Sequence, residues 1–311
     1  MSEESYNKNN IHGWVFIDKP IGMSSNKVLQ KIKKLFLNAK AGYVGTLDPL
    51  ASGFLPVAIG KATKTIKYLN NESKEYEFTV NWGIKTSTGD VEGSIIEKHK
   101  KFPTKNEIKQ QLKTFIGDLE QIPSKYSSIK INGKRAYKLV RQGKNFDMPK
   151  RKIKIKEFKL KKIINERKAV FKINCSSGTY VRTVVEDLAK ILGTVGHLTS
   201  LRRIGFGKLD KKLISLDSLI SFMHIDKLIK VLKPVDYIFE GVKKINIKQT
   251  DAKLLLDGNF FYVNSESETI TKDIPIKFVI ASYKNKIIAI GKINDGSFYP
   301  QTVMNLNIRK N

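Results

Sequence analysis

Apolar residues recur with a helical period in several segments of the chain, and these segments predict amphipathic helices. Residues 22–37 carry an apolar face and a lysine-rich face, with Ser24 or Ser25 as the helix N-cap. Residues 104–119 begin with Thr104 and Glu107 at the spacing of a capping box. The same period predicts further helices over residues 135–144, 180–193 and 216–234.

Alternation of apolar and polar residues predicts strands elsewhere. Residues 74–82 place aromatic and branched side chains on one face, as a half-buried strand does. Two further runs, 150–164 and 168–180, predict a hairpin, and the first alternates lysine with isoleucine to give one basic and one apolar face. A short apolar run over residues 13–20 predicts another strand.

Glycine and proline divide these elements. Residues 41–64 contain so many of both that a loop is expected, and Asn132-Gly133 is typical of a tight turn. From about Lys244 onward, short strand-like runs separated by Asn, Asp, Gly and Ser predict a small all-β module. Strands and helices mix without strict alternation, so we expect an α+β fold with a mixed or mostly antiparallel sheet.

The composition adds a strong positive charge. The chain has 311 residues, with 57 Lys plus Arg against 29 Asp plus Glu, a formal net charge of +28. Such an excess indicates a polyanionic partner, either nucleic acid or an anionic membrane, although lysine-rich usage also follows from genome base composition. Seven of the eight arginines lie between Arg135 and Arg203. Because guanidinium makes bidentate contacts that ammonium cannot, we expect the functional site to draw on this segment.

Other classes are disfavoured. Cys175 is the single cysteine, and the four histidines show no metal-ligand spacing, so neither a disulfide nor a zinc cluster is expected. Residues 1–10 are polar and predict a disordered tail rather than a secretion signal. No run of eighteen apolar residues is present, and a cytoplasmic protein is expected.

One acidic residue, Asp48, stands alone in the stretch "AGYVGTLDPLASGFLPVAIGKATK". An Asp before Pro is ordinary turn chemistry. Glycines around a single carboxylate also allow a ligand to approach the backbone closely while the carboxylate projects into a pocket. The spacing alone leaves both interpretations open.

The run GTLDPLA within this stretch resembles the signature of the TruB family of tRNA pseudouridine synthases. Further resemblances follow in the family's order: "FIDKPIGMSSN", "KEYEF", "PSKYSSIKINGKRAYKLVRQG", "CSSGTYVRTVVEDLAKILG" and "GHLTSLRR". They extend from Gly13 to Arg203. The resemblance implies a pseudouridine-synthase domain over residues 11–243, with a central mixed sheet flanked by helices and an RNA-contacting insertion at about 124–152, followed by a PUA-like RNA-binding barrel over residues 244–311.

The resemblance also implies roles for individual residues. Asp48 matches the family's catalytic aspartate and Arg182 the arginine that pairs with it, since a cation beside a carboxylate favours its ionised form. The family usually has histidine where this chain has Tyr43, which keeps an aromatic ring but lacks imidazole chemistry. The remaining matches are Tyr76, which stacks on the target base; Tyr180 and Leu201, which line the uridine pocket; and Lys19 and Lys64, which lie beside it.

The implied reaction isomerises uridine-55 in the T loop of tRNA, without a metal or an organic cofactor. Lysine-rich segments between Lys125 and Lys162 are expected to follow the RNA backbone. The implied partner is the T stem-loop, with no DNA, membrane or obligate protein partner, and the protein is expected to be a monomer. A tRNA-binding or tRNA-folding protein with secondary or lost activity is the alternative. A guide-RNA-dependent relative and a DNA-binding protein fit less well.

Overall fold

The computed structural model describes residues 7–222, 224–263 and 278–305 of the chain. Most of the predicted tail, residues 1–6, lies outside this range. Lys8–Asn10 form a 3-10 turn, η1, where the sequence predicted disorder. The Asn7 side chain accepts a hydrogen bond from the Asn9 amide at 2.9 Å, which gives this turn a local cap.

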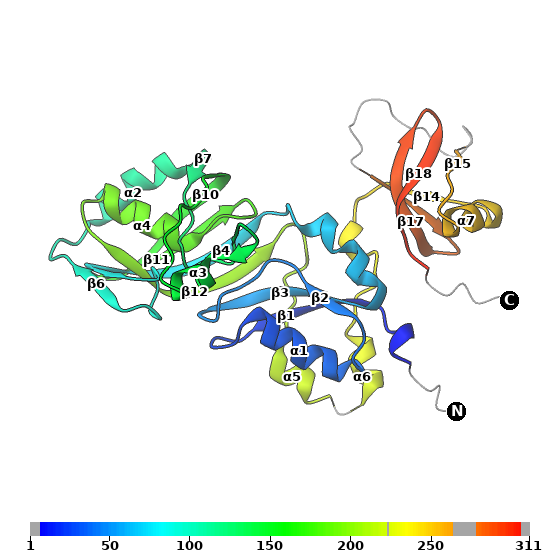
Figure 1. The fold of residues 1–311 in the computed structure, drawn as a ribbon, viewed down its shortest axis with the longest axis horizontal. Helices are drawn as coiled ribbons and strands as arrows, with labels where there is room; N and C mark the ends of the chain where they lie inside the picture. The colour runs from blue at the N-terminus through cyan, green and yellow to red at the C-terminus, as the bar shows by residue number, and fades with distance from the viewer. Residues whose placement is uncertain (1–6, 223, 264–277, 306–311) are drawn as a thin grey trace.

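A nine-stranded sheet forms the centre of the molecule (Figure 1). Its strands run in the order β13-β1-β3-β12-β4-β11-β10-β7, and β2 pairs with β3. Only β1–β13 and β3–β12 are parallel, so the prediction of a mixed, largely antiparallel sheet is confirmed. The strands are β1 Gly13–Lys19, β2 Ala41–Tyr43, β3 Ala51–Ile59, β4 Lys74–Trp82, β7 Gly117–Gln121, β10 Arg151–Asn165, β11 Lys168–Cys175, β12 Gly196–Phe206 and β13 Ile214–Ser215.

Helices pack against this sheet at both ends (Figure 1). Around β10 and β11 the core includes residues of α2 and α4, and around β1 it includes residues of α1, α5 and α6. The predicted caps are confirmed, with Ser24 capping α1 and a Thr104–Glu107 capping box starting α2. The helices are α1 Ser25–Leu35, α2 Lys105–Leu112, α3 Ala136–Arg141, α4 Val181–Ile191, α5 Leu216–Ile220 and α6 Ile225–Lys230.

Two predictions of local structure were wrong. Residues 216–234 form two short helices instead of one: α5 begins after the Ser215 cap and ends at Ile220, and α6 begins only at Ile225. Residues 41–64 include strands β2 and β3 instead of a loop. On one side of β3, Pro56 is the register partner of Phe16 of β1, and on the other side it falls in the gap between the residues that pair with β12 and those that pair with β2. A residue without an amide hydrogen is tolerated at such a gap in the pairing.

The two small hairpins lie outside the main sheet. Lys130–Ile131 (β8) pairs with Lys134–Arg135 (β9), and Asn132 and Gly133 between them both have positive φ, as the predicted turn requires. This hairpin and α3 make up part of the predicted insertion. The other hairpin joins β5 Ile84–Thr86 to β6 Ile95–Lys98.

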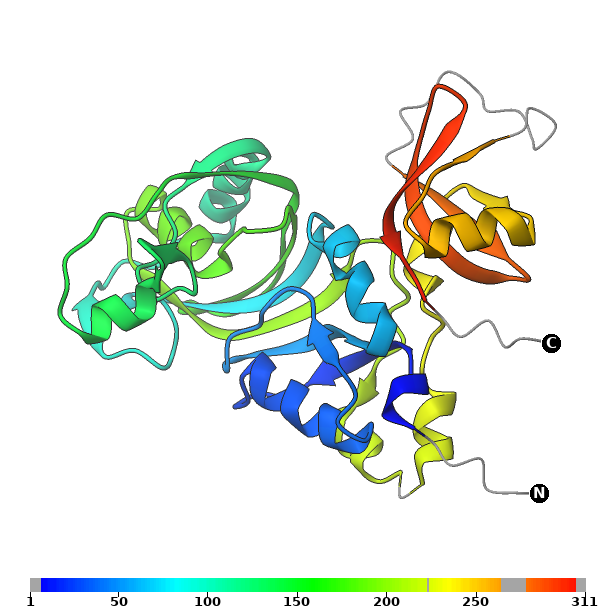
Figure 2. The same cartoon turned by 45° about the vertical axis from the view of Figure 1, so that its right-hand side comes forward.

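The C-terminal residues form a separate curled sheet, visible in orange and red in Figure 2. Its order is β14-β16-β17-β18-β15, consistent with a PUA-like module. The module is not all-β, however, because helix α7 (Gln249–Leu256) supplies Ala252 and Leu255 to its core. Residues 264–277 of the predicted module lie outside the described residues. The strands are β14 Lys244–Asn246, β15 Phe261–Tyr262, β16 Val279–Tyr283, β17 Lys286–Asn294 and β18 Ser297–Val303.

The 3-10 segment η2 (Gly60–Leu69) follows β3 in the chain and makes contacts with the C-terminal sheet. The Lys64 Nζ donates a hydrogen bond to the Val303 carbonyl at 2.7 Å, and the Tyr68 and Thr302 hydroxyls lie 2.9 Å apart. Apolar residues from both sides, including Leu69, share one core cluster. The C-terminal sheet is therefore packed on the segment that directly follows β3. Among the described residues, no helix has the length and apolar character needed to cross a membrane.

Replacing Lys64 with methionine should loosen this junction. The variant loses one partly exposed hydrogen bond, which contributes about 1 kcal/mol. Amides of β18 should then exchange with deuterium roughly fivefold faster than in the wild type. Lys34→Met, on the exposed face of α1, is the matched control and should leave β18 unchanged. Equal exchange in β18 of the wild type and Lys64→Met would contradict this role.

Candidate active site

A cavity of about 260 Å³ lies where the loop before β3 meets β4, β12 and the start of α4. It collects residues from five distant parts of the sequence. Five of the eight predicted site residues line it: Asp48, Tyr76, Tyr180, Arg182 and Leu201. Sequence reasoning did not assign the other lining residues to the site, notably Lys74, Arg203 and the 176–179 turn.

The Asp48 loop is held by hydrogen bonds from both sides. The buried Ser25 hydroxyl, in the first turn of α1, accepts from the Leu47 amide at 2.8 Å and donates to the Leu47 carbonyl at 3.0 Å. The Gly22 amide donates to the Pro49 carbonyl at 2.8 Å. With both flanking residues fixed, the Asp48 side chain has a defined direction toward the cavity, and it remains 44% exposed.

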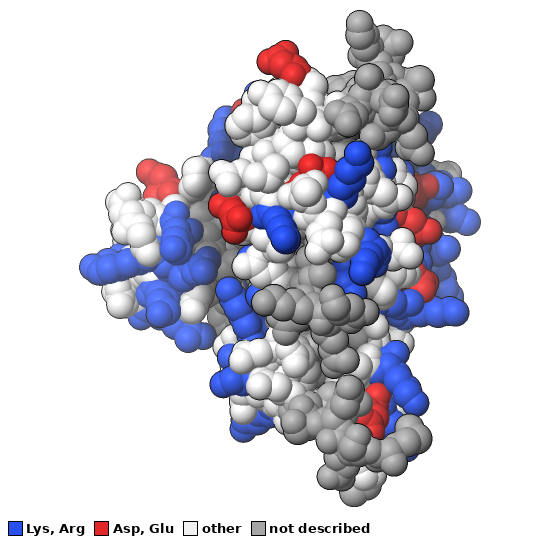
Figure 3. Space-filling model, turned by 90° about the vertical axis from the view of Figure 1, so that its right-hand side faces the viewer, with Lys and Arg blue, Asp and Glu red and all other residues white. Residues whose placement is uncertain are grey.

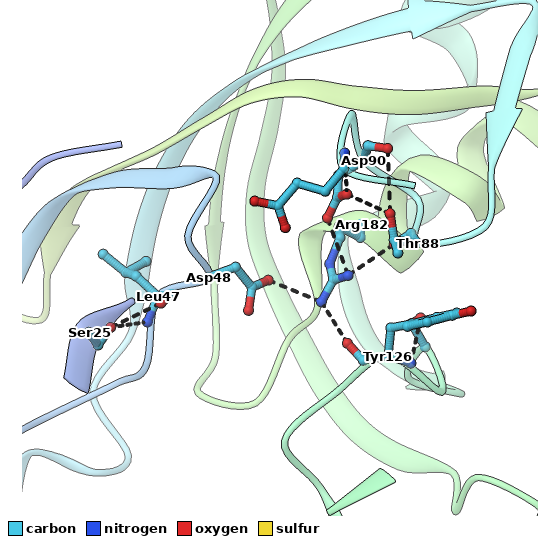
Figure 4. A network of polar contacts seen from close by, with 9 residues as sticks. Ser25, Leu47, Asp48, Thr88, Asp90, Tyr126 and Arg182 are labelled. Atoms are coloured by element: carbon cyan, nitrogen blue, oxygen red, sulfur yellow. Dashed lines mark hydrogen bonds and ion pairs between the residues drawn. The ribbon is translucent and has the colours of Figure 1, made fainter. Parts of the chain in front are cut away.

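Arg182 joins the Asp48 loop to two other segments (Figure 4). One guanidinium nitrogen lies 3.0 Å from the Asp48 carboxylate and donates to the Tyr126 carbonyl at 3.0 Å. The other lies 3.3 Å from the Asp90 carboxylate and donates to the Thr88 carbonyl at 2.9 Å. The Arg182 side chain is only 7% exposed. Four partners therefore fix the orientation of the guanidinium, which holds it beside the Asp48 carboxylate.

Asp90 is a component that the sequence analysis missed. Its carboxylate is buried and accepts hydrogen bonds from the Thr88 hydroxyl at 2.6 Å and from the Glu92 amide at 3.0 Å. No sequence signal marked it, because a second acceptor for the five donors of a guanidinium is needed only where that group is buried, and the burial of Arg182 is known only from the structure.

Negative charge collects on this side of the cavity. Burial raises the pKa of Glu92, and the neighbouring carboxylates of Asp90 and Asp48 raise it further. A single guanidinium, Arg182, lies between Asp48 and Asp90. Removal of that cation would leave a buried carboxylate without its ionic partner, which is a strongly unfavourable arrangement.

Two further basic residues, Arg203 and Lys74, line the cavity. Arg203 is almost fully buried and donates from Nε to the Phe54 carbonyl at 2.6 Å and from a terminal nitrogen to the Gly45 carbonyl at 2.8 Å. Gly45 has φ +70°, and a Cβ there would lie 2.9 Å from the guanidinium, so this position favours glycine. Lys74 is also buried, and burial lowers its pKa to about 8.

Three side chains give the cavity its apolar and aromatic surface. Tyr76 points from β4 and is buried, which raises the pKa of its hydroxyl. Leu201 from β12 is also buried. Tyr180 precedes α4, and its backbone amide and carbonyl both bond to the Gln121 side chain, at 2.9 and 3.1 Å. The cavity therefore has two aromatic rings and the aliphatic side chain of Leu201 in its lining, together with the Asp48 carboxylate.

Three predicted residues lie outside the cavity. Lys19 is fully buried behind the Asp48 loop, where its Nζ donates to the Pro20 and Met23 carbonyls, and burial lowers its pKa to about 8. Tyr43 packs against the core cluster around α1. Lys64 contacts β18, as described above, and does not line the cavity.

The arrangement suits chemistry performed by one carboxylate. Asp48 is accessible from the cavity, has a fixed guanidinium partner and faces a space with an aromatic wall. Such a group can act as a nucleophile or as a general base toward a bound molecule. Among the described residues, no three His, Cys, Asp or Glu side chains are grouped so that they could hold a metal ion.

Models of known families match two consecutive parts of the chain. The model described as "TruB family pseudouridylate synthase (N terminal domain)" matches residues 33–181. The model described as "tRNA pseudouridylate synthase B C-terminal domain" matches residues 182–240. The first match includes Asp48 and the second includes Arg182.

Solved structures share the fold. An H/ACA ribonucleoprotein bound to a substrate RNA containing 2′-deoxyuridine has a chain that matches 96% of this one with a TM-score of 0.69 at 23% identity, over 86% of its own length. A Cbf5-Nop10-Gar1 complex gives a TM-score of 0.68 at 23% identity, covering 97% of this chain and 88% of the matched chain.

Curated relatives resemble the chain over nearly its whole length. The tRNA pseudouridine synthase B of Bradyrhizobium diazoefficiens is 35% identical over 305 residues, which cover 96% of this chain and 87% of the relative. That of Caulobacter vibrioides is 35% identical over 300 residues, covering 95% and 97%. The chain therefore belongs to the TruB family of pseudouridylate synthases.

Proposed function

We propose that this protein converts uridine-55 in the T loop of tRNA to pseudouridine, with Asp48 as the catalytic carboxylate. The observation that carries the proposal is the pairing of Asp48 with Arg182 at 3.0 Å at the edge of a cavity that Tyr76 also lines. The relatives that match most of the chain are named tRNA pseudouridine synthase B, which supports tRNA as the substrate.

The reaction breaks the bond between uracil N1 and ribose C1′ and forms a bond between C5 and C1′. The proton lost from C5 is balanced by the proton gained at N1, so the product is an isomer and no electrons are exchanged with another molecule. Asp48 either adds covalently to the nucleoside or removes a proton from the sugar. Both roles require a carboxylate that reaches the nucleoside, and the Arg182 guanidinium 3.0 Å away fixes the direction of that side chain.

The target base must leave the T loop before it reaches Asp48. Flipping a base out of its stack costs a few kcal/mol. Stacking on an aromatic side chain returns about 1 to 3 kcal/mol per base, so one ring offsets much of that cost. Tyr76 is suited to this task because it lines the cavity from a rigid central strand. Leu201, on the neighbouring strand β12, supplies an apolar contact.

The RNA backbone would follow the lysine-rich insertion and β10. Arg182 bonds to the Tyr126 carbonyl, so the insertion is attached directly to the cavity. Phosphate contacts of this kind set affinity, while the folded shape of the T arm sets specificity. That the protein acts without a partner protein, as a monomer and in the cytoplasm, stays a prediction.

Asp48→Asn should abolish release of tritium from uridine labelled at C5 in an unmodified tRNA transcript. The amide keeps the size of the side chain but cannot act as a nucleophile or base, so turnover should fall at least about 1000-fold. Asp226→Asn is the matched control, because Asp226 is an exposed aspartate of α6 and does not line the cavity. That variant should retain wild-type release.

Mapping the modified nucleotide in the same transcript tests whether uridine-55 is the target of the reaction. Pseudouridine at uridine-55 alone supports the proposal. Release from neither the wild type nor the control would instead favour a tRNA-binding or tRNA-folding protein, and equal release from Asp48→Asn would remove Asp48 from the mechanism.

Lys74 should make substrate affinity dependent on pH. Its pKa of about 8 means that it is charged below pH 8 and loses its charge as the pH rises through that value. If the ammonium in the cavity wall attracts a phosphate, the KM for tRNA should rise roughly threefold to tenfold between pH 7 and pH 9. Lys74→Arg keeps its charge over this range and should show a flatter KM profile. Identical profiles of KM against pH for the wild type and Lys74→Arg would contradict a role of the Lys74 charge in binding tRNA.

A further inference from the structure

A second cavity lies at the end of the central sheet where β7 is the last strand, between β7, β10 and helix α4 (Figure 1). Its volume is about 210 Å³, and it shares no lining residue with the catalytic cavity. We call this cavity the β7 pocket. Six apolar residues contribute to its lining: Phe115, Leu119, Ile153, Ile155, Val184 and Ile191.

The β7 pocket has buried walls and an open mouth. Phe115, Ile153, Ile155 and Val184 are buried, whereas Ile191, the last residue of α4, is 51% exposed. An apolar cavity of about 150 Å³ is large enough to hold a benzene ring. The β7 pocket therefore has room for one aromatic ring, or for a branched aliphatic group of that size, with a short arm that reaches the mouth.

Two carboxylates lie in the lining, and they differ in their partners. Glu120 lies 3.2 Å from the Lys150 Nζ. Asp187, an exposed residue of α4, has no ion pair or hydrogen bond within the described ranges. Burial raises the pKa of Asp187, and Lys190 on the same helix lowers it. Because Asp187 and Ile191 are four residues apart on α4, they share one face and mark the mouth of the pocket.

We infer that the β7 pocket binds a small organic cation, with the apolar body of the ligand between β10 and α4 and its ammonium group on Asp187. Small-molecule sites are mostly apolar cavities in which a few polar groups fix the orientation of the ligand. An ionised carboxylate only accepts hydrogen bonds, and an ammonium group only donates them. The one lining carboxylate without a partner therefore selects a cation over a neutral or anionic molecule of the same shape.

The location of the pocket argues against RNA as its ligand. Lysine and arginine side chains predominate on the side of the molecule that carries the C-terminal sheet (Figure 3), and the β7 pocket lies at the opposite end (Figure 1). Two carboxylates in an apolar lining would repel a phosphate chain. Charges farther away than about 8 Å are largely screened at physiological ionic strength, so the net charge of +28 does not by itself exclude a cation.

A peptide strand is also disfavoured. Strand β7 is at the edge of the sheet, and an extended segment could in principle pair with its open side. Asp118, however, is exposed in the middle of this strand, and charged side chains on edge strands oppose such pairing. A small molecule needs no backbone pairing and uses only the cavity.

The catalytic cavity is the other place where a carboxylate meets an aromatic lining. Asp48 is paired there with Arg182 at 3.0 Å, so an added cation competes with a fixed guanidinium. Asp187 has no such competitor. Gln121 joins the two cavities, because it lines the β7 pocket and bonds to the backbone of Tyr180 at 2.9 and 3.1 Å. Variants at Asp48 and Asp187 therefore distinguish binding in one cavity from binding in the other.

The test measures binding of phenethylamine to the full-length protein by NMR, with the δ1 methyl groups of isoleucine labelled. The methyl groups of Ile153, Ile155 and Ile191 should shift and saturate as the probe is added, because these residues line the pocket. Those of Ile17 and Ile59, in the core around α1, should not move. They also report whether each variant is folded.

The charge of Asp187 should decide the affinity. Asp187→Asn should bind phenethylamine at least about tenfold more weakly than the wild type, because a hydrogen bond to an ionised group is lost. 2-Phenylethanol, which has the same ring without the cation, should bind both proteins equally and weakly. Leu119→Trp fills the pocket from β7 and should abolish the shifts caused by either probe. Asp48→Asn should bind phenethylamine as the wild type does.

Four results would overturn the inference. They are equal affinity of the wild type and Asp187→Asn for phenethylamine, equal affinity of the wild type for the amine and the alcohol, loss of binding in Asp48→Asn, and shifts of the pocket methyl groups on raising the protein concentration without a probe. The last result would assign the pocket to a second copy of the chain. Because the readout needs neither tRNA nor turnover, failure of this site and failure of the proposed function are separable.

Discussion

The ion pairs of Arg182 are the interaction on which the site depends. One guanidinium lies between Asp48, which is open to the cavity, and Asp90, which is buried. It also bonds to backbone carbonyls of two different loops. A buried charge is stable only when it is paired and fully hydrogen-bonded. The requirements of Arg182 therefore fix four chain segments relative to one another, and the position of the reactive carboxylate follows from them.

The sheet brings these segments together. The parallel pairing of β3 with β12 places Leu201 beside Ala51, three residues after Asp48, and the antiparallel pairing of β12 with β4 puts Arg203 next to Tyr76. The Leu198 amide bonds to the Gly89 carbonyl at 3.0 Å, which holds the Asp90 turn against the same strand. Strand β12 is thus the scaffold that joins the acidic side, the basic side and the aromatic wall of the cavity.

Much of this arrangement could be predicted from the sequence, where the signal was local. The caps at Ser24 and Thr104, the periods of α1 and α4, and the resemblance of the GTLDPLA run gave the helices, the family and the candidate pair Asp48 and Arg182. Contacts between residues that lie far apart along the chain could not be predicted in this way. Lys64 bonds to a carbonyl 239 residues later, and Asp90 stands in an ordinary-looking Thr-Gly-Asp turn until α4 approaches it. Strand β3 could not be predicted for the same reason, since its glycine and proline residues favour a loop until the pairing of β3 with β1, β2 and β12 is known.

The most direct test of the central claim is a double-mutant cycle on Arg182 and Asp90, read by single-turnover rates of pseudouridine formation. If Asp90 acts only by holding Arg182, Asp90→Asn should reduce the rate about 100-fold, and adding it to Arg182→Lys should cost little beyond the loss from Arg182→Lys alone. Losses that multiply in the double variant would contradict the account, because the two residues would then act independently of each other.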